Sequence, residues 1–341
     1  MSATPSGARR FAVLLATLLV AVLGLVPGPA AHAEPDLPDP AAPAGTDPTV
    51  TLVTGDRVTL RDSATGPPVA ATIEPARWPG RVVSFRSTIV EGELRVVPSD
   101  VAHLVPSVLD PRLFEVSTLA RSGLHDAASG SLPLIVQQTP ELATTGALTA
   151  GRPLPSIDAV AVALPKASAG AIGQVLASGA PERVWLDAPV RAATAPAGPE
   201  PGGLDRNLAQ IGAPAAWQAG LSGAGVRVAV LDTGVDANHP DLVGQVAAQA
   251  NFTDTPDPGD HNGHGTHVAS VVAGTGMAAG GARRGVAFEA TLLSGKVLDD
   301  RGVGSFSSII AGMEWAVAQG ARVVNLSLSS DAASTGRDPL S

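Results

Sequence analysis

Short apolar runs alternate with amphipathic segments in the last third of the chain. Three of these runs suit buried strands of a parallel sheet: Val226–Leu231, Ala290–Leu298 and Arg322–Leu328. Apolar residues recur at helical spacing after His264 and again over Ser307–Gln319, which Gly320 would end. Strands that alternate with helices predict an α/β fold, in which helices cover both faces of a parallel sheet.

The same periodicity predicts which side of each helix is buried. In the helix after His264, the expected inward residues are Val268, Val271 and Val272. In the second helix they are Phe306, Ile309, Ile310, Met313 and Val317. Both helices are therefore expected to pack on the sheet.

The region before residue 200 lacks this repeating pattern of strand and helix. Thr49–Leu60 and Arg81–Pro98 each contain two alternating runs around a turn, which predicts two hairpins. From residue 132, strands are expected over residues 132–138, 157–164 and 182–187, with a helix over residues 167–177. Residues 189–203 are rich in Ala, Pro and Gly, a composition typical of a linker.

The N-terminus has the features of a targeting segment. Two arginines at residues 9 and 10 precede an apolar run of 16 residues, shorter than the about 20 that a membrane helix needs. Ala31-His32-Ala33 fits a signal-peptide cleavage site. Residues 1–33 are therefore predicted to be a signal peptide, and the exported protein to have no membrane association after cleavage.

Composition narrows the classes of function. Apolar residues make up 45% of the 341-residue chain, which is long enough for two domains with hydrophobic cores. A net charge of −9 offers a nucleic acid no basic surface, so no nucleic-acid partner is expected. The chain has no cysteine, which excludes disulfides and thiolate metal sites.

Two residues lie where acid–base chemistry could be built. Asp232 directly follows a predicted parallel strand, and sites in open α/β sheets gather beyond the carboxyl ends of the strands. His264 lies between two glycines at the expected start of a helix. A serine hydroxyl needs a base to take its proton, and an imidazole oriented by a carboxylate is such a base. The alternative is that Asp232 only forms a turn and His264 only begins a helix.

A zinc site is a second alternative, because His261, His264 and His267 recur at every third position. Zinc-binding histidine pairs on a helix are four residues apart and have a Glu beside the first histidine. Neither feature is present here. The spacing therefore disfavours zinc.

The residues around Asp232 and His264 resemble a known family. Asp232-Thr-Gly with His239-Pro-Asp-Leu, followed by His264-Gly-Thr-His-Val-Ala, is similar to the subtilisin-like serine peptidases, over about residues 205–341. The resemblance implies that Asp232 is the orienting acid and that His264 is the general base. It also implies a subtilisin-like parallel sheet with helices on both faces for residues 204–341.

The resemblance also assigns the regions before residue 204. Residues 132–193 resemble the second half of the family's inhibitory propeptide, an α+β module with a ferredoxin-like half. Residues 34–131 would be a hairpin-rich part of the prosegment, and residues 194–203 a linker that holds the processing site. Autoprocessing is expected between about Val190 and Leu204.

By the same resemblance, the loop before the second helix forms one edge of a cleft, to which an extended substrate adds as a β-strand. Gly302 and Gly304 would admit the substrate backbone, and Phe306 would form the wall of a side-chain pocket. The opposite edge would consist of Ser327, Leu328 and Ser329. Where Ser329 stands the family commonly has glycine, so the shape of this pocket is expected to differ.

Some members of the family bind calcium, and Asp241 matches one ligand position. The companion stretch, residues 274–285, is rich in Gly and Ala and carries no acid. Neither a metal ion nor another cofactor is predicted.

The family's nucleophile is missing from this sequence. That serine lies in a G-T-S-x-A segment, and no such segment occurs in the 341 residues. The nearest serines beside glycine are Ser222, Ser294 and Ser305, and none has the family's context. The chain is therefore expected to be the front part of a longer precursor and to be inactive alone.

The leading hypothesis is a secreted, extracellular bacterial serine endopeptidase made as a preproenzyme. It would hydrolyse protein or peptide substrates by acyl transfer through an Asp-His-Ser triad whose serine lies beyond residue 341. Its own propeptide would be an intramolecular inhibitor. The alternative is an inactive fragment that binds peptides, or that acts through residues 132–193 as a protease inhibitor or folding chaperone.

Overall fold

The structure is a computed structural model, and it describes residues 47–63, 66–137, 148, 151–177, 183–193, 206–281, 283–330 and 336–341. The predicted signal peptide (residues 1–33) and residues 194–203 of the predicted linker lie outside these ranges. The composition of residues 189–203 wrongly extended the linker over Pro189–Ala192, which form a strand. Among the described residues, no helix has both the length and the apolar character of a membrane span. Residues 47–341 pack as one unit.

A parallel sheet organises the described residues from 206 onward. Its four strands lie in the order β12 (Val246–Asn251), β13 (Thr291–Lys296), β11 (Arg227–Asp232) and β15 (Val323–Asn325). From β11 the chain first adds β12 and β13 on one side and later β15 on the other, so the strand order reverses at β11. A crevice forms beyond the carboxyl ends of the strands at such a point. Asp232 is the last residue of β11.

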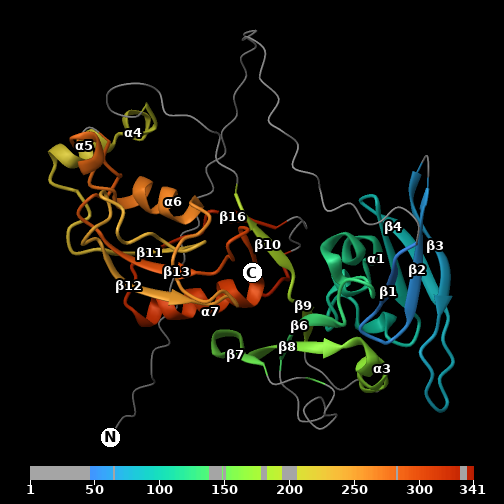
Figure 1. The fold of residues 1–341 in the computed structure, drawn as a ribbon. Coiled ribbons are helices and arrows are strands. Elements are labelled where there is room, and N and C mark those ends of the chain that lie inside the picture. Colours follow the sequence, from blue (N-terminus) through green and yellow to red (C-terminus); the bar gives the residue numbers. More distant parts are fainter. Residues whose placement is uncertain are drawn as a thin grey trace, which may run out of the picture. The chain divides into compact units, whose positions relative to one another are not determined.

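Helices α6 (His264–Ala273) and α7 (Phe306–Ala318) cover opposite faces of this sheet (Figure 1). Successive side chains of a strand point to opposite faces. Leu231 belongs to the core under α7, whereas Val230 belongs to the core under α6. Asp232 therefore faces α6, the helix that begins with His264. This arrangement confirms the predicted α/β fold with a helix-covered parallel sheet.

The buried sides of the two helices differ in part from the prediction. Phe306, Ile309 and Ile310 of α7 are buried as predicted, but Val317 is 71% exposed and Ala316 is buried instead. In α6, Val271 is 42% exposed, whereas the alanines Ala269 and Ala273 are fully buried. The predictions for Val317 and Val271 were therefore wrong.

Small residues explain both errors. A Cβ at Gly312 would lie 2.6 Å from the side chain of Val297, so α7 packs closely against the sheet along Gly312 and Ala316. In α6 the buried residues Gly265, Ala269 and Ala273 follow one another at intervals of four. Residues four apart lie on one side of a helix, and a row of small ones brings the backbone near the sheet.

Residues 131–186 form an antiparallel sheet with one helix. The strand order is β7 (Arg152–Leu154), β8 (Ala159–Pro165), β6 (Ser131–Gln137) and β9 (Val184–Leu186), and α3 (Ala169–Ala177) lies between β8 and β9 in the chain. β8 and β9 both pair antiparallel with β6, so they are parallel to each other with one strand between them. This is a split β-α-β unit.

Residues 47–124, the N-terminal extension, contain two further sheets. One consists of β1 (Thr49–Thr51), β2 (Arg57–Ser63) and β3 (Gly66–Glu74), and the other of β4 (Phe85–Val90) and β5 (Glu93–Pro98). Both predicted hairpins are present, as β1–β2 and β4–β5. Between β4 and β5, Glu91 and Gly92 both have positive φ, which is typical of a two-residue hairpin turn.

Short helices complete the described residues. In the N-terminal extension they are η1 (Ala102–Leu104), η2 (Pro111–Phe114), α1 (Val116–Leu119) and η3 (Ala120–Leu124). Elsewhere they are η4 (Pro155–Ile157), η5 (Lys166–Ser168), α4 (Arg206–Gln210), α5 (Ala213–Gln218) and η6 (Met277–Ala279).

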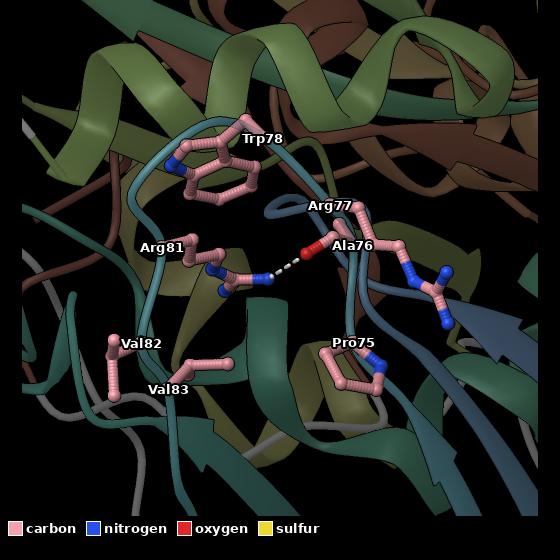
Figure 2. Close-up of a pocket in the computed structure, with 7 residues that line it drawn as sticks. All are labelled: Pro75, Ala76, Arg77, Trp78, Arg81, Val82 and Val83. Atoms are coloured by element: carbon pink, nitrogen blue, oxygen red, sulfur yellow. Dashed lines mark hydrogen bonds between the residues drawn. The ribbon is translucent and has the colours of Figure 1, made fainter.

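The N-terminal extension holds a buried charge cluster beside an open pocket. Asp56 is fully buried and accepts hydrogen bonds from Thr54 and from the guanidinium of Arg81. That guanidinium lies 4.0 Å from the ring centroid of Trp78 and donates to the carbonyl of Ala76 (Figure 2). The pocket has a volume of about 530 Å³ and is lined by residues from 75 to 83, none of which is a predicted site residue.

Candidate active site

The structure brings Asp232 and His264 into direct contact. Nδ1 of His264 lies 2.7 Å from Oδ1 of Asp232. The backbone N–H of Thr233 donates to the same oxygen at 2.7 Å. Oδ2 of Asp232 is buried and accepts no hydrogen bond from the described residues. The strand end and the helix start thus form one corner, which we call the Asp232–His264 corner.

The glycine after His264 makes this contact possible. A Cβ on Gly265 would lie 2.1 Å from the carbonyl oxygen of Gly234 and 3.2 Å from Cβ of Asp232. Any side chain here would push the start of α6 away from the end of β11. The N–H of Gly265 also donates to the hydroxyl of Thr233 at 2.9 Å.

A further carboxylate, which sequence reasoning missed, ties the two sides of the corner together. Oδ1 of Asp260 accepts from the hydroxyl of Thr233 and from the N–H of Gly263, both at 2.8 Å. Its Oδ2 accepts from the N–H and the hydroxyl of Thr266, at 2.8 and 2.6 Å. One side chain thus fixes the strand end, through Thr233, and the helix start, through Gly263 and Thr266 on either side of His264. The available signal in the sequence was the position of Asp260 shortly before a predicted helix, where acids commonly accept hydrogen bonds from the first backbone N–H groups.

Lys296 supports the corner from the neighbouring strand. It ends β13 and is fully buried, and its ammonium donates to the carbonyls of Thr233 at 2.6 Å and Gly259 at 3.1 Å. It also forms an ion pair with Asp300 at 2.8 Å. A buried charge is tolerated only with such partners. Its position gave no signal in the sequence, because most lysines lie on the surface.

The two side chains of the corner have shifted pKa values. Burial raises the pKa of Asp232, and the hydrogen bonds from His264 and from the backbone of Thr233 offset this only in part. For His264, burial alone would lower the pKa. The hydrogen bond and negative charge of Asp232 outweigh burial, so the pKa of His264 is raised above its ordinary value of 6.5.

The second ring nitrogen of His264 also faces an oxygen. Nε2 lies 2.8 Å from the carbonyl oxygen of Ala193. A carbonyl oxygen can only accept, so Nε2 donates here, while Nδ1 faces the carboxylate of Asp232. A ring that carries both protons satisfies both contacts, which agrees with the raised pKa.

The predicted cleft residues meet one segment of the chain, β10 (Pro189–Ala192). β10 lies in a small sheet between β14 (Val303–Ser305) and β16 (Leu328–Ser329) and is antiparallel to both. The N–H of Ala192 donates to the carbonyl of Gly302 at 2.8 Å, and that of Ala193 to the carbonyl of Ser327 at 3.0 Å.

All six predicted cleft residues thus lie against residues 188–193. Gly304 pairs with Val190, and Ser329 with Arg191, whereas the N–H of Phe306 donates to the carbonyl of Ala188. The remaining three are Gly302, Ser327 and Leu328, which lie against Ala192 and Ala193. The structure adds a reason for glycine at Gly304: a Cβ there would lie 2.2 Å from the carbonyl oxygen of Val297.

Asp187, also missed by sequence reasoning, joins the segment before β10 to the start of α7. Its two oxygens accept from the N–H and the hydroxyl of Ser307, at 2.9 and 2.6 Å. Asp187 is nearly buried, and burial raises its pKa against the opposing effect of the hydrogen bonds from Ser307. A second contact lies further along α7, where the N–H of Ser156 donates to Glu314 at 2.7 Å.

The other candidate groups have different partners. The hydroxyl of Ser222 donates to Glu289, and that of Ser305 caps α7 by accepting from the N–H of Ser308. Asp241 accepts from the N–H of Ala278 at 2.7 Å. Within the described ranges, no group of three or more His, Cys, Asp or Glu residues could hold a metal ion.

Sequence comparisons place this corner among known proteins. Residues 223–341 match the model of the subtilase family. The chain is 45% identical over 130 residues to the intracellular serine protease of Paenibacillus polymyxa, a match that covers 37% of this chain and 39% of that protein. It is 43% identical over 137 residues to the minor extracellular protease Vpr of Bacillus subtilis (strain 168), covering 37% of this chain and 16% of that protein.

Thermitase of Thermoactinomyces vulgaris is 39% identical over 133 residues, covering 37% of this chain and 45% of that protein. The chain thus spans less than half the length of each of these relatives. The matched residues include the strand end that carries Asp232 and the helix start that carries His264. The part of this chain from residue 223 to residue 341 therefore belongs to the subtilase family, the subtilisin-like serine peptidases.

Proposed function

We propose that residues 206–341 are the first part of the catalytic domain of a subtilisin-like serine endopeptidase made as a preproenzyme. Asp232 would hold the imidazole in the correct orientation and stabilise its charged form. His264 would take the proton of a serine hydroxyl and later give it to the leaving amine. That serine would lie in sequence after residue 341, so the 341-residue chain alone would not hydrolyse peptides.

The observation that carries this proposal is the position of residues 189–193. They lie in the cleft as an extended strand and form backbone hydrogen bonds with both edges, as an added peptide substrate would. At the end of this segment, the carbonyl oxygen of Ala193 touches Nε2 of His264. Residues 131–193 would thus be the intramolecular inhibitor, bound in the manner of a substrate.

This position defines the expected processing site. The peptide bond whose carbonyl touches His264 is the one between Ala193 and Thr194, within the window from Val190 to Leu204. In the complete protein we expect autoprocessing at this bond. N-terminal sequencing of the mature protein should begin at Thr194, and a His264→Ala variant should remain unprocessed. A mature N-terminus well outside residues 190–204 would contradict the proposal.

The same positions predict a substrate preference. Ala192 and Ala193 precede the proposed cleavage site, and Ser329 stands where the family commonly has glycine. We therefore expect small residues to be preferred on the amino side of the cleaved bond. Cleavage of a peptide library by the mature enzyme would measure this, and a preference for large aromatic residues at that position would contradict it.

The missing nucleophile separates the proposal from its alternative, an inactive peptide-binding or inhibitory fragment. Reading the coding sequence after residue 341 should reveal a G-T-S-x-A segment. A stop codon directly after Ser341 would favour the alternative. The 341-residue chain itself should not react with a fluorophosphonate probe, and labelling of one of its serines would contradict the assignment.

Secretion rests on the predicted signal peptide in residues 1–33. Names of relatives point both ways, since one is an extracellular protease and another an intracellular one. We expect the mature protein in the culture medium. A variant of the protein that lacks residues 1–33 should remain inside the cell. Export of that variant would contradict the proposal.

A further inference from the structure

Part of the N-terminal extension reaches the wall of the cleft. The guanidinium carbon of Arg112, in η2, lies 5.1 Å from the ring centroid of Phe306. A guanidinium within about 6 Å of an aromatic face is attracted by the ring. Phe306 begins α7, is 4% exposed and is the predicted wall of a substrate pocket.

Arg112 is held in this position by Asp110. Nη2 of Arg112 lies 2.7 Å from Oδ2 of Asp110, and Nε donates to the same oxygen at 2.9 Å. The side chains are only 11% and 5% exposed, so the ion pair is shielded from water. Paired in this way, the guanidinium has little freedom to leave the ring of Phe306.

The same segment forms an isolated parallel β-bridge with β9, between Leu109 and Val184. The N–H of Val184 donates to the carbonyl of Val108, and the N–H of Asp110 donates to the carbonyl of Val184, both at 2.9 Å. The side chain of Asp110 also accepts from the N–H of Leu186 at 3.3 Å. β9 leads within three residues to β10, the strand in the cleft.

We propose that the Asp110–Arg112 pair is a latch by which the N-terminal extension holds residues 131–193 on the substrate cleft. Asp110 braces β9, and Arg112 covers the ring that lines the pocket. The inhibitor then consists of residues 131–193 together with residues 108–112. That these residues inhibit an enzyme rests on the proposed function. The strength of the latch can be measured without any catalysis.

The latch is to be tested by hydrogen exchange in the intact 341-residue chain. The reporters are the amides of Ala192 and Ala193, which donate to the two edges of the cleft. Arg112→Ala should increase their exchange rates by about 5- to 30-fold, the effect of losing a desolvated cation–π contact. Arg112→Lys should give a smaller increase, because it keeps the charge but loses the planar fork.

Phe306→Leu is the second variant, because it removes the ring and leaves the Asp110–Arg112 pair intact. It should raise the exchange of the same two amides, and combining it with Arg112→Ala should add little, since each removes the same contact. Arg121→Ala is the matched control. Arg121 belongs to the same extension and pairs with Glu93, but it is 64% exposed.

Two further amides show whether a variant remains folded: Leu134 in β6 and Ala229 in β11 should keep their wild-type exchange. If Arg112→Ala loosens the whole extension, the test of the latch rests on the exchange rates in Phe306→Leu. Changes below twofold for Ala192 and Ala193 in Phe306→Leu overturn the latch, as does an equal increase in Arg121→Ala. Catalytic inactivity of the complete protein would overturn the proposed function and leave the exchange result standing.

Discussion

The Asp232–His264 corner and the cleft differ in where their partners come from. At the corner, Asp232 and His264 are held by Thr233, Asp260 and Lys296, all in the same subtilase part of the chain. The two edges of the cleft instead pair with residues 189–193, which precede that part. The corner is thus held by its own region, whereas the edges of the cleft are held by residues 189–193.

If residues 131–193 are a prosegment, as proposed above, this difference would separate assembly from activation. Loss of the prosegment would remove the central strand between β14 and β16 and expose unpaired backbone groups, which a substrate could pair with. The hydrogen bonds of the corner would remain. The contact of His264 Nε2 with the carbonyl of Ala193 links the corner directly to the segment in the cleft.

The largest expected effect concerns the chemistry of the corner. In the complete enzyme, Asp232→Asn should lower kcat by about 10⁴-fold, because the wrong imidazole tautomer is then held and its charge is not stabilised. Hydrolysis of a peptide substrate would measure this. His267→Gln, which changes an exposed histidine on the same helix, should leave kcat nearly unchanged. A decrease in kcat of less than tenfold in Asp232→Asn would contradict a catalytic role for this acid.

The second effect concerns the rigidity of the corner. Asp260→Ala should lower the free energy of unfolding by about 3 kcal/mol, because donors of Thr233, Gly263 and Thr266 lose their acceptor. Urea unfolding would measure this, with Asp257→Ala, an exposed acid of the same loop, expected within about 0.5 kcal/mol of wild type. Equal losses in the two variants would show that Asp260 does not fix the corner.

The stability that Asp260 contributes should depend on pH. Although burial opposes it, hydrogen bonds from Thr266 and Gly263 hold the pKa of Asp260 below its ordinary value of 3.8. This contribution is therefore present above about pH 4 and is lost as the pH falls through the lowered pKa. The acid-induced decrease in stability should be smaller in Asp260→Ala than in wild type.

A smaller effect is expected for the cleft. Asp187→Ala removes the acceptor at the start of α7. The free energy of local opening there should fall by about 1–2 kcal/mol, as measured by hydrogen exchange of the Ser307 amide. Because burial raises the pKa of Asp187, its contribution is greatest below the ordinary carboxyl pKa and decreases as the pH rises through the raised value. Asp187→Asn should abolish this pH dependence. If the pH dependence persists in that variant, it arises from another group.

The smallest effect is a shift at the contact between the two regions. The ring of His264 should titrate above pH 6.5 in the intact chain, because the hydrogen bond and negative charge of Asp232 outweigh burial, and its pKa should change when residues 131–193 are removed, because the contact with the carbonyl of Ala193 is then lost. The pair with Asp232 adds stability below about pH 6.5 and loses it as the pH rises through the raised pKa. NMR titration would measure both values. An unchanged pKa would show that the cleft does not influence the corner.

Sequence reasoning found the elements that have strong local signals. The motif around Asp232 and His264 placed a strand end and a helix start at one corner, and both hairpins were recognisable from their turns. It missed the small-residue sides of α6 and α7, because a periodicity based on large apolar residues ignores alanine and glycine. Val271 and Val317 were assigned inward for that reason and are exposed.

The sequence by itself predicted the family, the α/β order and the pairing of Asp232 with His264, because each prediction depends on motifs of residues close together in the chain. Only the tertiary structure decided that Asp260 and Lys296 hold the corner, that residues 189–193 lie in the cleft with Asp187 bonded to the start of α7, and that Arg112 reaches Phe306. These contacts join segments that lie up to 194 residues apart, as for Arg112 and Phe306. No local pattern encodes such pairs, since they depend on how sheets and helices pack.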